Sequence, residues 1–345
     1  MKRLLLLLLA ACSSQQAPAP APTTTQVAAP VPAPAPAPAG KKGTVATKSF
    51  KSNALGVEKD YVVYLPPGYD EQPTRRWPVF YYLHGLGGKE TDWVSGGHLD
   101  NAADTLGLQA IVVMPDGDDG FYADSAEPID YDACMKDGTG LFLPAYESKH
   151  STCVRKRSYE TYIVKDLVGE IDTKYRTIAT REGRAIAGLS MGGFGALELG
   201  MRHPDLFAAA ASHSGVDALL YAGPFPYVPG KVQLLKDPKE WGVGAGEIGA
   251  WIRGLFGTDL ATWKAYDPAT LAEKLEPGKP SLYLDCGTED GFLLNNGAQY
   301  LHDILVARKI DHAFFLGPGQ HDFRFWIPRL PESLKFLRDH TTKPT

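Results

Sequence analysis

The 345 residues suffice for two average domains or one large α/β domain, and a composition of 44% apolar and 22% charged residues excludes a wholly disordered or fibrous chain. With 40 acidic against 35 basic residues the formal charge is −5, so we expect no nucleic-acid partner. Four cysteines are too few for a disulfide scaffold, and their spacing (Cys12, Cys134, Cys153, Cys286) matches no zinc-binding pattern.

Residues 1–11 have the features of an export signal. Lys2 and Arg3 form a basic start, and the leucine run at 4–9 is far shorter than the ~20 residues that span a bilayer. The string LAAC at 9–12 resembles the bacterial lipobox, in which cleavage leaves the cysteine as an acylated N-terminus. We therefore expect a lipoprotein anchored through Cys12 to the periplasmic or cell-surface face of a bacterial membrane. A plain secretory signal that is cut near the same place is the alternative.

Residues 12–43 read as a tether. They are rich in Ala and Pro, and Pro alternates with other residues from 30 to 38. Because proline has no N–H to donate, this alternation excludes a helix or a sheet ladder and favours an extended chain.

Residues 44–345 are predicted to form one domain. Short apolar runs predict strands, and helical patterns lie between most of them, as at 162–175 and 298–309. The predicted strands are 62–65, 79–83, 110–114, 184–187, 208–212, 281–286 and 312–316. This alternation is typical of an α/β fold with a mostly parallel sheet covered by helices on both faces.

Two stretches, 120–158 and 216–275, look like insertions on this frame. The first contains Cys134 and Cys153, the natural partners for a disulfide in an oxidising compartment. The second has little strand pattern and is expected to cap a pocket. Its aromatic residues are interpreted as packing of that cap, with stacking on a substrate ring as the alternative.

Ser190 is the predicted nucleophile. The string GLSMGG at 188–193 fits G-x-S-x-G and lies between a predicted strand and a predicted helix, which is the context of a nucleophile elbow. The tight turn leaves no room for side chains at the two flanking glycines. It also sets the serine at a helix N-terminus, where developing negative charge is favoured.

A serine hydroxyl needs a base, and the base needs an orienting acid. In this kind of fold both follow the nucleophile in the chain, each just past a strand. Asp290 follows the strand 281–286 and is the predicted acid, with the adjacent Glu289 as the alternative. His321 follows the last strand and is the predicted base. The remaining candidates have other expected roles: His302 and His312 are structural, and His213 lines the pocket.

The tetrahedral intermediate also needs donors aimed at its oxygen. The backbone N–H of Met191, immediately after the nucleophile, is one. The second is expected from the glycine-rich loop HGLGG at 84–88, with Leu86 as the donor and Gly87 as the alternative.

Several motifs together resemble the esterase D group of α/β-hydrolases. They are LHGLGG at 83–88 with Asp92-Trp93, Asp116-Gly117 with Phe121-Tyr122, YET at 159–161, the elbow at 188–193, and His321 with Trp326. The group includes S-formylglutathione hydrolases, feruloyl and acetyl-xylan esterases, and the antigen 85 mycolyltransferases. The resemblance implies an α/β-hydrolase fold, a triad of Ser190, Asp290 and His321, and oxyanion donors at Leu86 and Met191. It does not fix the substrate.

We therefore expect a serine carboxylic-ester hydrolase that works through an acyl-enzyme, with carbohydrate-linked or phenolic esters as candidate substrates and no metal or organic cofactor. The alternatives are acyl transfer to a sugar hydroxyl and a non-catalytic binding protein on the same fold. The acidic string DGDDG at 116–120 suggests a calcium loop, but Phe121 stands where such a loop requires glycine. We interpret the string as an acidic rim beside the active site.

Overall fold

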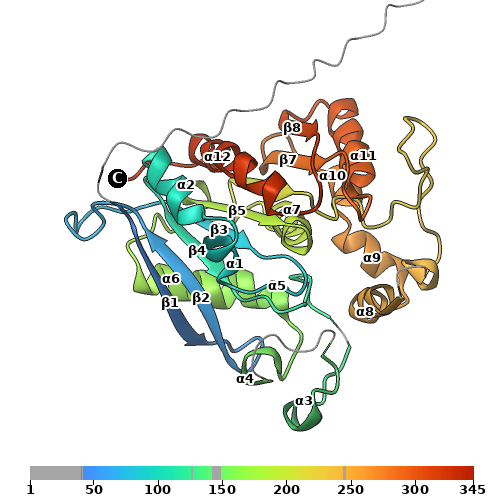
Figure 1. Cartoon of the computed structure of the whole chain (residues 1–345), viewed down its shortest axis with the longest axis horizontal. Coiled ribbons are helices and arrows are strands. Elements are labelled where there is room, and N and C mark those ends of the chain that lie inside the picture. The colour runs from blue at the N-terminus through green and yellow to red at the C-terminus, as the bar shows by residue number, and fades with distance from the viewer. Residues whose placement is uncertain (1–39, 41, 126, 142–148, 244–245) are drawn as a thin grey trace, which may run out of the picture. The chain divides into compact units, whose positions relative to one another are not determined.

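The computed structural model describes residues 40, 42–125, 127–141, 149–243 and 246–345. An eight-stranded sheet has the order β1-β2-β4-β3-β5-β6-β7-β8 (Figure 1). β1 and β2 are antiparallel to their neighbours, and every pairing from β4 to β8 is parallel. The strands are β1 (Thr44–Lys51), β2 (Glu58–Leu65), β3 (Val79–Leu83), β4 (Ile111–Pro115), β5 (Arg184–Leu189), β6 (Ala209–His213), β7 (Ser281–Gly287) and β8 (His312–Gly317).

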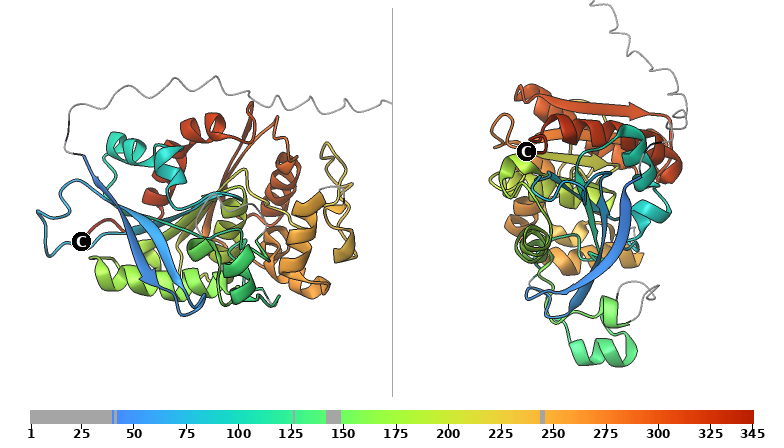
Figure 2. Two further views of the ribbon diagram at one scale, coloured as in Figure 1. Left: turned by 60° about the horizontal axis from the view of Figure 1, so that its bottom comes forward. Right: turned by 90° about the vertical axis from the view of Figure 1, so that its left-hand side faces the viewer.

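Helices cover both faces of the sheet, as the sequence predicted. Figures 1 and 2 show α2 and α12 on one face and α6 and α7 on the other. The helices are α1 (Asp92–Ser95), α2 (Leu99–Leu106), α3 (Tyr131–Asp137), α4 (Lys149–Thr152), α5 (Tyr159–Thr161), a π-helical turn (Tyr162–Leu167), α6 (Val168–Lys174), α7 (Met191–Arg202), α8 (Gly246–Phe256), α9 (Leu260–Tyr266), α10 (Pro268–Ala272), α11 (Leu294–Ala307) and α12 (Phe323–Asp339), with 3₁₀ turns at Arg181–Gly183 and Pro238–Glu240.

The two faces hold separate hydrophobic cores because successive strand residues point to opposite sides. In β3, Tyr81 packs with α6 and α7, whereas Phe80 and Tyr82 pack with α2 and α12. All five residues of β3 are buried, which explains its unbroken apolar run.

Each of the seven predicted strands overlaps a strand of the sheet, from β2 to β8. β1 was not predicted. It lies at the sheet edge with most of its residues exposed, and it is held by a full antiparallel register with β2 rather than by apolar side chains. β1 therefore lacks the apolar run by which the other strands were predicted.

The expected export signal (1–11), Cys12 and most of the expected tether (12–43) lie outside the described residues. Within the described part of the chain, no helix is both long and apolar enough to cross a membrane. The stretch 120–158 carries α3 and α4, and the stretch 216–275 carries α8, α9 and α10.

Candidate active site

Ser190 stands on a strained turn between β5 and α7. Its φ of 53° is positive, a conformation that side chains rarely adopt, and its N–H donates to the His213 carbonyl at 2.9 Å. A Cβ added to Gly188 would lie 2.2 Å from the Gly192 carbonyl oxygen, and one added to Gly192 would lie 2.3 Å from the Leu83 carbonyl oxygen. Only glycine fits at either position, so this turn requires the two glycines of the G-x-S-x-G motif.

Asp290 and His321 are bonded to each other. The His321 Nδ1 lies 2.7 Å from Asp290 Oδ2, and the other carboxylate oxygen accepts the Phe292 N–H at 2.8 Å. Asp290 is buried, whereas the alternative acid, Glu289, is exposed. The geometry therefore pairs His321 with the predicted acid rather than with its neighbour.

The His321 ring is held between two aromatic side chains. The Phe292 and Trp326 rings meet it edge-on, with centroids 4.9 and 5.0 Å away. The Trp326 indole N–H donates to Ser214 Oγ at 3.1 Å, which fixes the tryptophan in turn. These contacts restrict the imidazole to one orientation.

A cavity of about 790 Å³ brings the predicted residues together. Ser190, His321, Leu86 and Met191 all line it, and Asp290 lies behind His321. The other lining residues are Gly85, Gly87, Gly88, Asp92, Phe121, Leu189, Val216, Trp241, Ile248, Ile252, Phe292, Leu294, Phe323 and Trp326. Trp241, Ile248 and Ile252 come from the stretch 216–275, which thus forms one wall of the pocket.

In the loop after β3, one of the two candidate N–H donors is free to face a substrate and the other is already hydrogen-bonded. The Gly87 N–H donates to Asp119 Oδ1 at 2.7 Å, so it is engaged. No acceptor for the Leu86 N–H is found in the described part of the chain. The Met191 N–H belongs to the first turn of α7, where the backbone donors have no partner within the helix. Leu86 is thus the better placed of the two loop candidates.

The acidic string at 116–120 lies beside the active site, as expected, because Asp119 accepts from Gly87 at the cavity wall, but its first carboxylate, Asp116, is buried rather than part of a rim. The Lys59 ammonium is fully buried and pairs with Asp116 and with Asp118, the latter at 2.9 Å. Burial together with the neighbouring Asp116 raises the pKa of Asp118 to about 7, while the Lys59 charge holds the pKa of Asp116 well below its usual range. Sequence reasoning missed Lys59, because it lies between Glu58 and Asp60 at the start of β2 and nothing in that charged stretch indicates a buried side chain.

His84 fastens this acidic loop to the oxyanion loop. The Gly117 N–H donates to its Nε2 at 2.8 Å, so Nε2 must carry a lone pair and the ring proton sits on Nδ1. Nδ1 then donates to the Gly85 carbonyl at 2.8 Å. The tautomer is therefore set by the two loops that the ring joins.

His213 does not line the pocket, contrary to the expectation. It is fully buried, its Nδ1 lies 2.9 Å from Asp285 Oδ2, and its Nε2 lies 2.8 Å from Ser333 Oγ. His302 and His312 are bonded to each other at 2.8 Å, away from the cavity, which fits their expected structural role.

The two predicted disulfide partners, Cys134 and Cys153, are bonded. Cys286 is a buried thiol beside Asp290. Across the described ranges, no three His, Cys, Asp or Glu side chains converge in a way that would hold a metal ion.

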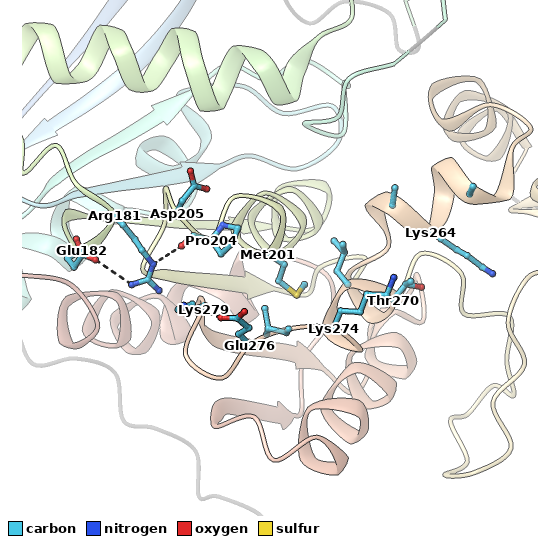
Figure 3. A pocket seen from close by; sticks show the side chains of 14 residues that line it. Arg181, Glu182, Met201, Pro204, Asp205, Lys264, Thr270, Lys274, Glu276 and Lys279 are labelled. Carbon is cyan, nitrogen blue, oxygen red and sulfur yellow. Dashed lines mark hydrogen bonds and ion pairs between the residues drawn. The ribbon is translucent and has the colours of Figure 1, made fainter.

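A second cavity of about 910 Å³ lies where the chain enters β5, β6 and β7, at the sheet edge opposite the elbow (Figure 3). Arg181 on its wall pairs with Glu182 and donates to the Pro204 carbonyl, so part of its charge is already neutralised. Its lining contains no Ser, Cys or His. It therefore lacks the pairing of serine and histidine that lines the cavity at Ser190.

Comparison with known proteins decides the family. The model of the Esterase family matches residues 52–337. The chain belongs to this family. Together with the sheet order described above, the match confirms the expected α/β-hydrolase fold.

Relatives agree with this assignment. Esterase Rv1288 of Mycobacterium tuberculosis is 34% identical over 170 residues, which are 49% of this chain and only 32% of that relative. The chain thus spans about a third of the length of that relative. S-formylglutathione hydrolase of Bos taurus is 27% identical over 290 residues, covering 83% of this chain and 88% of the relative.

Solved structures share the fold. A ferulic acid esterase has a TM-score of 0.60 at 24% identity, covering 86% of this chain and 97% of its own. An S-formylglutathione hydrolase from Agrobacterium tumefaciens has a TM-score of 0.62 at 22% identity, and the match covers 87% of this chain and 96% of the hydrolase. The predicted resemblance to the esterase D group is confirmed at the level of family and fold.

Proposed function

We propose that the domain hydrolyses carboxylic esters with Ser190 as nucleophile, His321 as base and Asp290 as the orienting acid. The observation that carries this proposal is the bond between His321 Nδ1 and Asp290 at 2.7 Å, made at the wall of the cavity into which the strained Ser190 also projects. Because Nδ1–H donates to the carboxylate, Nε2 is left with the lone pair that a general base needs.

The reaction takes two acyl transfers. Ser190 Oγ attacks the acyl carbon while His321 Nε2 takes its proton, and the Leu86 and Met191 N–H groups stabilise the oxyanion. Collapse of the intermediate breaks the ester bond, and the departing alcohol takes the proton from His321. Water, activated by the same imidazole, then attacks the acyl-enzyme and releases the acid.

The cavity favours a neutral substrate with a bulky apolar or aromatic group. Most of its lining is aliphatic or aromatic, and Asp92 and His321 are the only residues among those that line it with a titratable side chain. S-formylglutathione, named for several relatives, carries two carboxylates that would find no lysine or arginine there. Phenolic esters, as named for the ferulic acid esterases, fit this lining better.

The test is release of p-nitrophenol from acetyl, butyryl and octanoyl esters by the full chain and by Ser190→Ala. We expect hydrolysis by the wild type, a loss of about 10⁶ in kcat in the variant, and a preference for the longer acyl groups. S-formylglutathione should be at least ~10-fold poorer in kcat/KM than the best neutral ester. Hydrolysis that persists in Ser190→Ala would refute the assignment of the nucleophile.

We also propose that the protein is exported and anchored through lipid on Cys12. The Cys134–Cys153 disulfide supports an oxidising compartment, and the LAAC string supports acylation. In membrane fractionation, Cys12→Ser should move the esterase activity from the membrane pellet to the soluble fraction. An unchanged distribution would refute the lipid anchor.

A further inference from the structure

We infer that Asp119 is a positioning residue that sets the oxyanion loop and couples it to the cap helix α8. The inference rests on the proposed hydrolase function, because it concerns the donors of that reaction. Asp119 lies in the loop after β4, on neither β3 nor α7, and it touches both the Gly87 backbone and the Trp251 side chain. The sequence marked it only as part of the acidic string at 116–120, with no role of its own.

The first step is how the Leu86 N–H is aimed. In a trans peptide the C=O and N–H point in opposite directions, so fixing one fixes the other. The Gly85 carbonyl is held by His84 Nδ1 at 2.8 Å and by the Gly88 N–H at 3.0 Å. The Leu86 N–H of the same peptide is thereby turned away from those partners.

The second step is the neighbouring peptide. Its Gly87 N–H donates to Asp119 Oδ1 at 2.7 Å, a bond between a carboxylate and an amide and therefore stronger than a neutral one. With both peptides flanking Leu86 pinned, the loop cannot exchange the Leu86 N–H for the Gly87 N–H at the oxyanion position. Asp119 thus selects which amide serves as the donor.

The third step is what holds Asp119 itself. Its neighbour Asp118 has a positive φ of 44° and accepts from Lys59 Nζ at 2.9 Å and from the Tyr159 hydroxyl at 2.7 Å. These bonds fix the backbone of the acidic loop and so the place from which the Asp119 side chain reaches Gly87.

The last step leads to the cap. The Asp119 carbonyl accepts the Trp251 indole N–H at 3.0 Å, and Trp251 lies on α8. The same helix supplies Ile248 and Ile252 to the cavity wall. The Arg157 guanidinium lies over the Trp251 ring, 4.7 Å from its centroid, and is a second contact that holds this side chain. One residue therefore links the wall that meets the substrate to the loop that stabilises the oxyanion.

The test compares Asp119→Ala with Asp119→Asn in p-nitrophenyl ester hydrolysis. Alanine removes the acceptor for Gly87 and should lower kcat about 10–100-fold with KM little changed, because misplaced donors matter most in the transition state. Asparagine keeps a carbonyl oxygen at that place and should restore kcat to within ~3-fold of the wild type. Trp251→Phe keeps the ring but loses the N–H, and should lower kcat about 3–10-fold.

Asp104→Ala is the matched control. Asp104 Oδ1 accepts the Gly43 N–H at 2.8 Å, a bond of the same kind but outside the cavity, so its loss should lower the melting temperature and leave kcat unchanged. Equal kcat in the wild type and Asp119→Ala would overturn the inference while leaving the esterase intact. Failure of Asp119→Asn to restore kcat would overturn it too, and an unchanged kcat in Trp251→Phe would overturn the link to α8. A wild type without esterase activity would instead refute the proposed function.

Discussion

In the described part of the domain, two sets of Ser, His and Asp side chains can be compared, and one of them lines a cavity while the other does not. Ser333, His213 and Asp285 are joined by bonds of 2.8 and 2.9 Å, the contacts expected of a catalytic triad, but all three are fully buried. Ser190 and His321 line the open cavity, with Asp290 behind them. Bonding between the three residue types therefore does not identify an active site by itself.

What separates the two sets is their surroundings. Ser190 sits on a strained turn at the N-terminus of α7, facing the glycine-rich loop that supplies an oxyanion donor. Ser333 lies inside the helix α12 and is surrounded by the Tyr82 hydroxyl and the Leu330 carbonyl. The buried set forms a polar network that holds α12 to the sheet, since its members come from β6, β7 and α12.

The largest expected difference is between the two histidines. His321→Ala should lower kcat by about 10⁵–10⁶ and the free energy of unfolding by about 1–3 kcal/mol, because Asp290 loses its imidazole partner at a cavity wall that water can enter. His213→Ala should leave kcat per folded molecule within ~3-fold and lower the free energy of unfolding by about 3–5 kcal/mol, because Asp285 loses a buried partner. Ester hydrolysis and urea unfolding of both variants measure this contrast. If folded His213→Ala lost as much kcat as His321→Ala, His213 would have to be catalytic rather than structural.

A smaller effect, on stability alone, is expected at Asp217, a buried carboxyl near the buried set of Ser333, His213 and Asp285. Its Oδ1 accepts from Ser212 Oγ at 2.7 Å, and within the described residues its Oδ2 has no partner. Burial, with a lesser contribution from the charge of Asp285, raises the pKa of Asp217 to about 7. The folded state therefore holds a proton that the unfolded state releases near pH 4, and the free energy of unfolding falls as the pH rises from about 4 to about 7.

Asp217→Asn tests this linkage, because asparagine stays neutral while it keeps an oxygen for Ser212. The free energy of unfolding of the variant, taken relative to that of the wild type, should rise by about 2–4 kcal/mol from pH 4.5 to pH 8. Urea unfolding of both proteins at the two pH values gives the difference, in which other titrating groups cancel. A difference that does not grow with pH would show that Asp217 is ionised in the folded protein throughout.

The contrast between the set at the cavity and the buried set also explains which site residues could be predicted from the sequence. Ser190, Asp290 and His321 each follow a strand within a few residues, so local pattern and chain order were enough to find them. Lys59 and Asp119 act on residues that are about 30 to 60 positions away in the chain, and no local pattern announces such contacts. His213 follows the predicted strand 208–212 in the same way, yet it is the last residue of β6 and is buried, because α12 packs over it. That packing cannot be inferred from the residues around position 213.

Secondary structure was missed for related reasons. α12 contains Pro328 and Pro331, which favour a break rather than a helix of this length, but its apolar face is buried against the sheet. The predicted helix at 162–175 is present as a π-helical turn followed by α6, because a periodicity near 3.6 does not report one local change of hydrogen bonding. At α12, tertiary packing therefore outweighs the local preference.

The smallest expected effect tests the strain at the elbow directly. Ser190→Gly and Ser190→Ala both remove the hydroxyl and should be equally inactive, but only glycine adopts the positive φ of 53° without cost. Ser190→Gly should therefore unfold with a free energy about 1–2 kcal/mol higher than Ser190→Ala. The same pair of substitutions at Ser333, inside α12, should differ by about 1 kcal/mol in the opposite direction, because glycine is the poorer helix former. Urea unfolding of the four variants gives both differences. Equal signs at the two serines would mean that the elbow is relaxed and that backbone strain does not distinguish the accessible serine from the buried one.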